Sequence, residues 1–91
     1  MNDVLIGTVV RVAEHPGARA PSFLLTVDFG QRGMHQTVLP SGDYEREQLE
    51  GSQIACRLEP DGPVVAGAHS HGKGFVLLRP DREVEAGTLV S

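Results

Sequence analysis

The chain has 91 residues, enough for one small domain, and we treat residues 1–91 as a single unit with one compact core. That core must be aliphatic, because the sequence holds no Trp, 1 Tyr and 3 Phe, while its 11 Gly and 6 Pro exclude a helical bundle. A formal net charge of −4 argues against a broad basic surface for nucleic acid, and we do not expect DNA as a partner.

The single cysteine, Cys56, has no partner for an internal disulfide, which is typical of a protein in a reducing compartment. It alternates with Ile54 and Leu58, so we interpret it as a small buried hydrophobe rather than a nucleophile. The sequence opens without a leader, and its apolar runs are far shorter than the ~20 residues of a membrane span. We therefore expect a cytoplasmic protein that has no membrane partner.

The first predicted strand covers residues 4–14, with a bend or bulge at Gly7. Alternation places four of its aliphatic residues on one face, namely Val4, Ile6, Val10 and Val12. A Pro/Gly-rich loop that holds Arg19 follows this strand. The second strand is predicted over residues 22–29, with one apolar face formed by Phe23, Leu25, Val27 and Phe29.

A tight turn over residues 31–33 leads to a third strand over residues 34–39. The only predicted helix covers residues 43–50, directs Tyr44 and Leu49 inward, and ends at Gly51. The remaining strands are expected over residues 53–58, 63–66, 75–78 and 88–90. Three strands, one short helix and further strands form the element order of an OB-fold. We therefore predict an all-β chain: an OB-fold-like small barrel with one short helix between strands three and four.

Several short motifs follow one another along the chain in a recognisable order. They are Ala18-Arg19-Ala20-Pro21, Asp28-Phe29-Gly30, His35-Gln36-Thr37-Val38, Tyr44, Leu49, Gly51, Ala66-Gly67, Ser70, Gly87-Thr88 and the run from Val76 to Val84. Together they resemble the tRNA-binding-domain family, and within it most of all the CsaA-type export chaperones. The segment between Ser70 and Phe75 is shorter than the family pattern by about one strand.

The resemblance implies a non-catalytic binding module without a cofactor. Its ligand would be tRNA or an unfolded polypeptide, bound in a cleft at the barrel mouth, and the family also implies a homodimer. The residues that match cleft positions are Arg19, Gln36, Thr37 and Ser70. Because the chain is acidic, a polypeptide is at least as good a candidate as RNA. The alternative is a structural or assembly domain that has lost the ligand site and only oligomerises.

Two further arginines, Arg11 and Arg57, lie on predicted strands and point away from the aliphatic residues. Each is either a ligand contact or an ordinary solvated charge. Aromatic residues stack on bases in OB-fold proteins that bind single strands. Here Phe23 and Phe29 share the aliphatic face, which favours core packing instead.

The four histidines do not form a pattern typical of a metal site. His69 and His71 have the spacing to share one face of a strand, but zinc takes three or four ligands, and only His15 and His35 remain. We interpret His69 and His71 as members of an exposed loop and expect no bound metal. Because neither a nucleophile elbow nor a Gly-rich phosphate loop appears, we also expect no enzymatic activity.

Overall fold

A computed structural model of the chain describes residues 3–15, 22–40 and 44–91. Its elements follow in the order β1 (Val4–Glu14), β2 (Ser22–Asp28), the 3₁₀ turn η1 (Gly30–Arg32), β3 (Met34–Pro40), α1 (Arg46–Leu49), β4 (Gln53–Glu59), β5 (Gly62–Val65), β6 (Gly67–Ser70) and β7 (Gly74–Leu77). The boundaries predicted for β1 to β4 agree with the structure to within one residue at each end.

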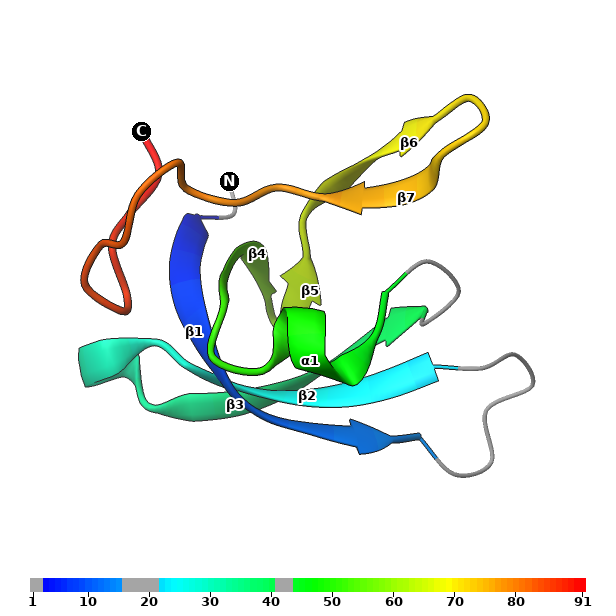
Figure 1. Ribbon diagram of the computed structural model, residues 1–91. Helices are drawn as coiled ribbons and strands as arrows, with labels where there is room; N and C mark the ends of the chain where they lie inside the picture. Colours follow the sequence, from blue (N-terminus) through cyan, green and yellow to red (C-terminus); the bar gives the residue numbers. More distant parts are fainter. Residues whose placement is uncertain (1–2, 16–21, 41–43) are drawn as a thin grey trace.

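Five strands form one antiparallel sheet in the order β3-β2-β1-β4-β5, which curls into a nearly closed barrel (Figure 1). The long strand β1 makes this curl because its first half pairs with β4 and its second half pairs with β2. The predicted OB-like barrel, with its one short helix between β3 and β4, is confirmed.

The barrel interior is filled by aliphatic side chains around one phenylalanine, Phe29, which is fully buried. The predicted apolar face of the second strand is confirmed, since Leu25 and Val27 are also fully buried and Phe23 packs against the core. Phe29 needs space that β1 supplies by having no side chain at Gly7. A Cβ atom built there would lie 2.7 Å from the Phe29 ring and 2.3 Å from a methyl group of Val27.

The prediction that the aliphatic residues of the first strand share one face is wrong, and a β-bulge explains why. The pairing of β1 with β2 slips between Val9 and Arg11, so that Val10 is an extra residue. A bulge of this kind shifts the alternation of the strand by one residue. The barrel core therefore takes Leu5 and Val9 from the first half of β1 and Val12 from the second half, while Val10 is 43% exposed.

The helix is shorter than predicted. It starts at Arg46 because Glu45 has an extended conformation, and the Glu45 N–H donates a 2.8 Å hydrogen bond to the side-chain oxygen of Gln48. Both predicted inward contacts are confirmed: Leu49 is fully buried, and Tyr44 packs against the core. The Tyr44 hydroxyl accepts a 2.9 Å hydrogen bond from the Leu77 N–H, which ties the segment before the helix to β7.

The barrel closes along a seam between β3 and β5, the two end strands of the sheet. No backbone ladder joins these strands in the part of the chain that the structure describes. Instead, the buried hydroxyl of Thr37 donates a 2.8 Å hydrogen bond to the Pro63 carbonyl oxygen. A side-chain bond thus takes the place of backbone pairing at this seam.

Strands β6 and β7 form a separate hairpin that projects from the barrel (Figure 1). Strand β6 was not predicted, and the interpretation of His69 as part of a loop is wrong. Its sequence, Gly67-Ala68-His69-Ser70, lacks apolar alternation, and it forms a strand through its pairing with β7. The predicted strand over residues 88–90 is reduced to one bridge, between Leu5 and Leu89.

The C-terminal segment after β7 lies against the outside of β1 and β4, and Gln53 holds it there. The Gln53 amide donates to the Val84 carbonyl at 2.6 Å and accepts from the Val84 N–H at 2.9 Å. This double hydrogen bond resembles the pairing between two strands. It keeps the segment over Ile6 and Ala55, which point away from the barrel interior and are nevertheless buried.

We expect Gly7→Ala to lower the free energy of unfolding by roughly 1–3 kcal/mol, because the new methyl group overlaps Val27 and Phe29. Urea denaturation followed by circular dichroism measures this change. Ser70→Ala, in an exposed position of β6, serves as the control and should stay within about 0.5 kcal/mol of the parent. A Gly7→Ala protein as stable as the parent would mean that the close packing of β1 on Phe29 is not a constraint.

We expect Thr37→Val to cost roughly 1–2 kcal/mol, since the isosteric side chain leaves the Pro63 carbonyl at the seam without its donor. The matched control is Thr26→Val in β2, where the threonine is half-buried on the outside of the barrel. Thermal and urea unfolding of the two variants should separate them. Equal stabilities would show that the hydroxyl does not hold the seam.

Candidate binding surface

The outer side of β1, β2 and β3 carries a face that the strand register arranges in cross-strand rows. In one row Arg11 of β1 stands opposite Thr26 of β2, which stands opposite Gln36 of β3. The next row consists of Ala13, Leu24 and Val38. We call the residues of these two rows, together with Val10 and Met34, the outer face. Strands β2 and β3, which carry much of this face, lie at the bottom of the barrel in Figure 1, away from the β6–β7 hairpin.

The bulge in β1 determines what the outer face displays. Val10 and Arg11 are both exposed, and they lie between the buried residues Val9 and Val12. Neighbouring side chains can point to the same side of a strand only where the alternation is interrupted. Val38 and Met34 on β3 are exposed as well, at 42% and 62%. The face therefore combines aliphatic surface with hydrogen-bonding side chains.

The positive charge of the outer face is that of Arg11. Among the described residues, no carboxylate forms an ion pair with it. Elsewhere several arginines lie close to carboxylates. Arg57 is 2.8 Å from Glu59, Arg82 is 3.7 Å from Asp81, and Arg32 is 3.9 Å from Asp3. The described residues thus do not gather their cations into the basic patch that a phosphate backbone requires.

A pocket of about 600 Å³ opens beside the outer face at the edge of β3. We call it the seam pocket. It is lined by Arg32, His35, Leu58, Glu59, Pro60, Asp61, Gly62 and Pro63. The turn between β4 and β5 forms one wall, and the start of β3 forms the other. In OB-folds, the loop between strands four and five and the face of strands two and three are the usual places for ligands.

The predicted site residues fall into different places. Arg11 and Gln36 belong to one row of the outer face. Thr37 points to the opposite side, where its hydroxyl is used within the fold, and Arg57 is bonded to Glu59 of the seam pocket. Ser70 lies at the end of β6, in the hairpin. Arg19 lies outside the described residues, so the predicted cleft is not assembled by the part that is described.

The sequence analysis missed two groups of residues at this surface. Thr26, Leu24 and Val38 could have been found from the alternation of β2 and β3, since they occupy the positions between the buried residues. Asp61 and His35 had no local signal, because only the barrel closure brings the turn between β4 and β5 next to β3.

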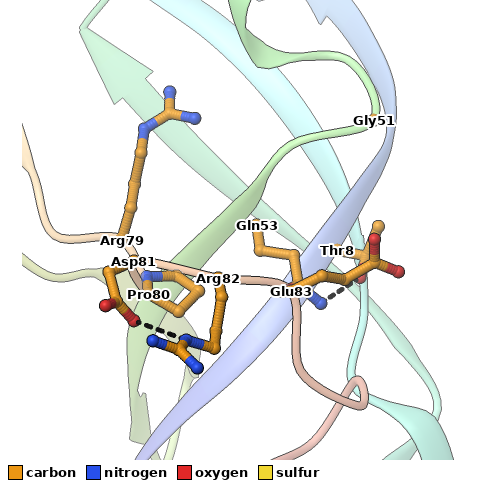
Figure 2. A pocket seen from close by; sticks show the side chains of 8 residues that line it. All are labelled: Thr8, Gly51, Gln53, Arg79, Pro80, Asp81, Arg82 and Glu83. Atoms are coloured by element: carbon orange, nitrogen blue, oxygen red, sulfur yellow. Dashed lines mark hydrogen bonds and ion pairs between the residues drawn. The ribbon is translucent and has the colours of Figure 1, made fainter.

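A second, polar pocket of about 340 Å³ lies where the C-terminal segment crosses β1 and β4 (Figure 2). Its groups are largely engaged with one another: the Gln53 amide contacts the Thr8 hydroxyl at 3.1 Å, and Arg82 pairs with Asp81. Arg79 points away from these residues in Figure 2 and lies 6.0 Å from the Tyr44 ring. We assign this pocket to the anchoring of the C-terminal segment.

Cys56 is fully buried in the barrel core, as predicted, and burial raises the pKa of its thiol to about 12. The thiolate form needed for nucleophilic chemistry is therefore disfavoured.

Within the described residues, the histidines predicted not to bind a metal are not gathered into a metal site. The His69 ring packs edge-on against the Phe75 ring, with 5.3 Å between the two ring centroids. Across residues 3–15, 22–40 and 44–91, no group of three or more His, Cys, Asp or Glu side chains is arranged to hold a metal ion. The described chain also holds no helix with the length and hydropathy of a membrane span.

Comparisons with known proteins agree with this architecture. No protein-family model matches the sequence. The chaperone CsaA from Bacillus anthracis shares 32% identity over 99% of this chain and 91% of its own, with a TM-score of 0.89. The CsaA chaperone from Picrophilus torridus has the same fold at 23% identity, with 99% and 92% coverage and a TM-score of 0.89. A MetRS-related protein from Pyrococcus horikoshii has it at 18% identity, with 99% and 90% coverage and a TM-score of 0.79.

These neighbours support a binding module, and the match to the Bacillus anthracis protein extends over nearly the whole chain. The resemblance found in the sequence motifs is confirmed by this identity and by the shared barrel. The chain belongs to the CsaA-type branch of the tRNA-binding-domain family.

Proposed function

We propose that the chain is a non-catalytic module that binds polypeptide segments in an extended, non-native conformation, in the manner of a chaperone. The outer face is its binding surface. The observation that carries this proposal is the composition of that face, which sets uncharged hydrogen-bonding residues and one cation, Arg11, among exposed aliphatic residues. The predicted ligand residues that we retain here are Arg11 and Gln36, together with Arg19, which lies outside the described residues.

An unfolded polypeptide offers what this surface can use. Its backbone supplies hydrogen-bond donors and acceptors for Gln36 and Thr26, and its apolar side chains gain by covering Val10, Val38 and Met34. We assign the other predicted contacts indirect parts: Thr37 holds the seam, and Arg57 holds Glu59. Ser70 lies on the hairpin, where a long segment would have to extend beyond the outer face to reach it.

The tRNA alternative fits the described surface less well. Phosphate binding needs several cations on one face, and the outer face has one. Sequence-tolerant binding of single strands relies on exposed aromatic rings, while Phe29 is buried and Phe23 packs against the core. That the Bacillus anthracis relative is called a chaperone is consistent with a polypeptide ligand. The free, buried Cys56 agrees with the cytoplasmic setting that we infer for this activity.

Fluorescence anisotropy with a labelled polypeptide, kept unfolded by alkylation of its cysteines, tests the proposal. We expect saturable binding that excess bulk tRNA does not displace. Val38→Ser should weaken this binding about fivefold, or ~1 kcal/mol, because it removes apolar contact area from the outer face. The matched control is Val64→Ser, since Val64 has nearly the same exposure, 40%, but lies on β5.

Two results would contradict the proposal. One is salt-sensitive binding of tRNA together with no binding of the unfolded polypeptide, which would mark an RNA-binding protein. The other is an equal loss of affinity in Val38→Ser and Val64→Ser, which would place the ligand somewhere other than the outer face.

A second candidate function, assembly with a second copy of the chain, is favoured by an apolar groove near the two termini. The groove has a volume of about 320 Å³, and we call its lining the terminal groove: Val4, Ile6, Ala55, Leu78, Arg79, Pro80, Val84, Thr88, Leu89 and Val90. Leu78, Leu89 and Val90 are each about half exposed. Residues 87–90 pair with β1 along one edge, and in the described chain no strand pairs with their other edge.

Two copies could join these free edges across a two-fold axis, which would cover the exposed leucines of both terminal grooves. Light scattering should then give about twice the monomer mass of 9.7 kDa. Leu89→Asp should return the protein to the monomer, since it buries a charge in the interface. Val76→Asp, at an exposed position on the hairpin, is the control and should leave the dimer intact. A monomer for the parent protein at high concentration would refute the assembly.

A further inference from the structure

We propose that the bound polypeptide adds as an extra strand to the free edge of β3 and places a cationic side chain in the seam pocket, beside Asp61. The inference rests on the proposed function. It goes further by naming how the segment is held and which side chain the site prefers.

The free edge of β3 is equipped for strand addition near Gln36. The Phe29 N–H donates to the Gly33 carbonyl at 2.9 Å, at the turn where β2 leads into β3. Hydrogen-bonded pairs alternate along an antiparallel ladder, so Val27 and His35 form the next hydrogen-bonded pair of that ladder. Met34 and Gln36 fall at the positions between, and their backbone N–H and C=O groups point toward the free edge. An extended segment can pair with such groups.

The space beside this edge is left by the way in which the barrel closes. The bond from Thr37 to Pro63 holds β3 to β5 at one point of the seam. Toward the start of β3 the seam pocket opens between His35 and the turn at Pro60 and Asp61, with a volume of about 600 Å³. An added strand would lie about 4.8 Å from β3. Alternate side chains of that strand would then point into the seam pocket.

The charges of the seam pocket favour a cation. Arg57 bonds to Glu59 at 2.8 Å, and Asp3 lies 3.9 Å from Arg32. In the described chain, however, Asp61 has no ion-pair partner, so its charge is the uncompensated one.

Apolar surface lies beside this carboxylate, from Leu58, Pro60 and Pro63. A lysine or arginine side chain suits such a place, because its methylene stem covers apolar surface while its charged end reaches a carboxylate. The site would thus prefer extended segments that set a basic residue among aliphatic ones.

The first arm of the test uses three labelled, capped eight-residue peptides that alternate valine and serine and differ only at one central position, with Lys, Gln or Glu. Anisotropy with the parent protein should give the highest affinity for the Lys peptide, a lower one for the Gln peptide and the lowest for the Glu peptide. The dissociation constants of the Lys and Glu peptides should differ by about three- to tenfold. Asp61→Asn should remove most of this preference. The control Asp81→Asn, at another exposed carboxylate that lies beside Arg82, should keep it.

The second arm tests strand addition with two N-methylated forms of the Lys peptide. Each form is methylated at every second backbone nitrogen, and the two forms, the two methylation phases, carry the methyl groups on opposite sets of nitrogens. One form should not bind, because its methyl groups block the N–H groups that face β3, and the other should change the affinity by less than about threefold.

The outcomes separate the inference from the proposed function. Binding of the Lys and Glu peptides with equal affinity, or an unchanged preference in Asp61→Asn, would overturn the cation site. Equal effects of the two methylation phases would overturn strand addition. In each of these cases the polypeptide-binding function would stand, whereas binding of none of the peptides would remove both.

Discussion

The hydrogen bond from the Thr37 hydroxyl to the Pro63 carbonyl is the contact on which the rest of this structure depends. A sheet that curls into a barrel normally closes by backbone pairing between its first and last strands, which removes the edges. Here β3 and β5 meet through a side chain instead, and Pro63 has no N–H to offer a partner strand. The barrel is therefore held shut at one point while the edge of β3 stays available beyond it.

A second constraint acts from inside the barrel. The core is small, because it consists of Phe29 and the aliphatic residues around it. Strand β1 must therefore lie close to the Phe29 ring. Gly7 permits that approach, and the bulge at Val10 shifts the alternation of β1 by one residue, so that Val12 points into the core. The same bulge turns Val10 and Arg11 outward together. Packing inside the barrel and the display of a mixed surface outside it are thus two consequences of one irregularity.

The sequence predicts the part of this fold that strict alternation encodes. A period of two relates Phe23, Leu25, Val27 and Phe29, and these residues of β2 and of the position after it all contact the core. The bulge in β1 was not predictable, because Val9 and Val10 are both apolar and only the pairing with β2 decides which of them turns inward. Strand β6 was missed for a different reason: its small and polar residues acquire extended structure from β7 rather than from their own preference.

For the binding surface, single residues were predictable but their grouping was not. Arg11 and Gln36 were each candidates, yet it takes the register through Thr26 to place them in one row. The sequence did not indicate Asp61 as a candidate site residue, because the turn that holds it lies beside β3 only in the closed barrel. Family resemblance supplied the expectation of a ligand, while the free edge of β3 and the charge beside it are the basis on which we propose its kind.

The most direct measurement is the map of amide chemical-shift changes when the ¹⁵N-labelled chain is titrated with the lysine-containing peptide. The account predicts that the largest changes follow the edge of β3 at Met34 and Gln36 and continue to Asp61, with smaller ones at Arg11 and Thr26. Changes confined to the C-terminal segment or to the β6–β7 hairpin would contradict it, because the open edge of the barrel would then have no part in binding.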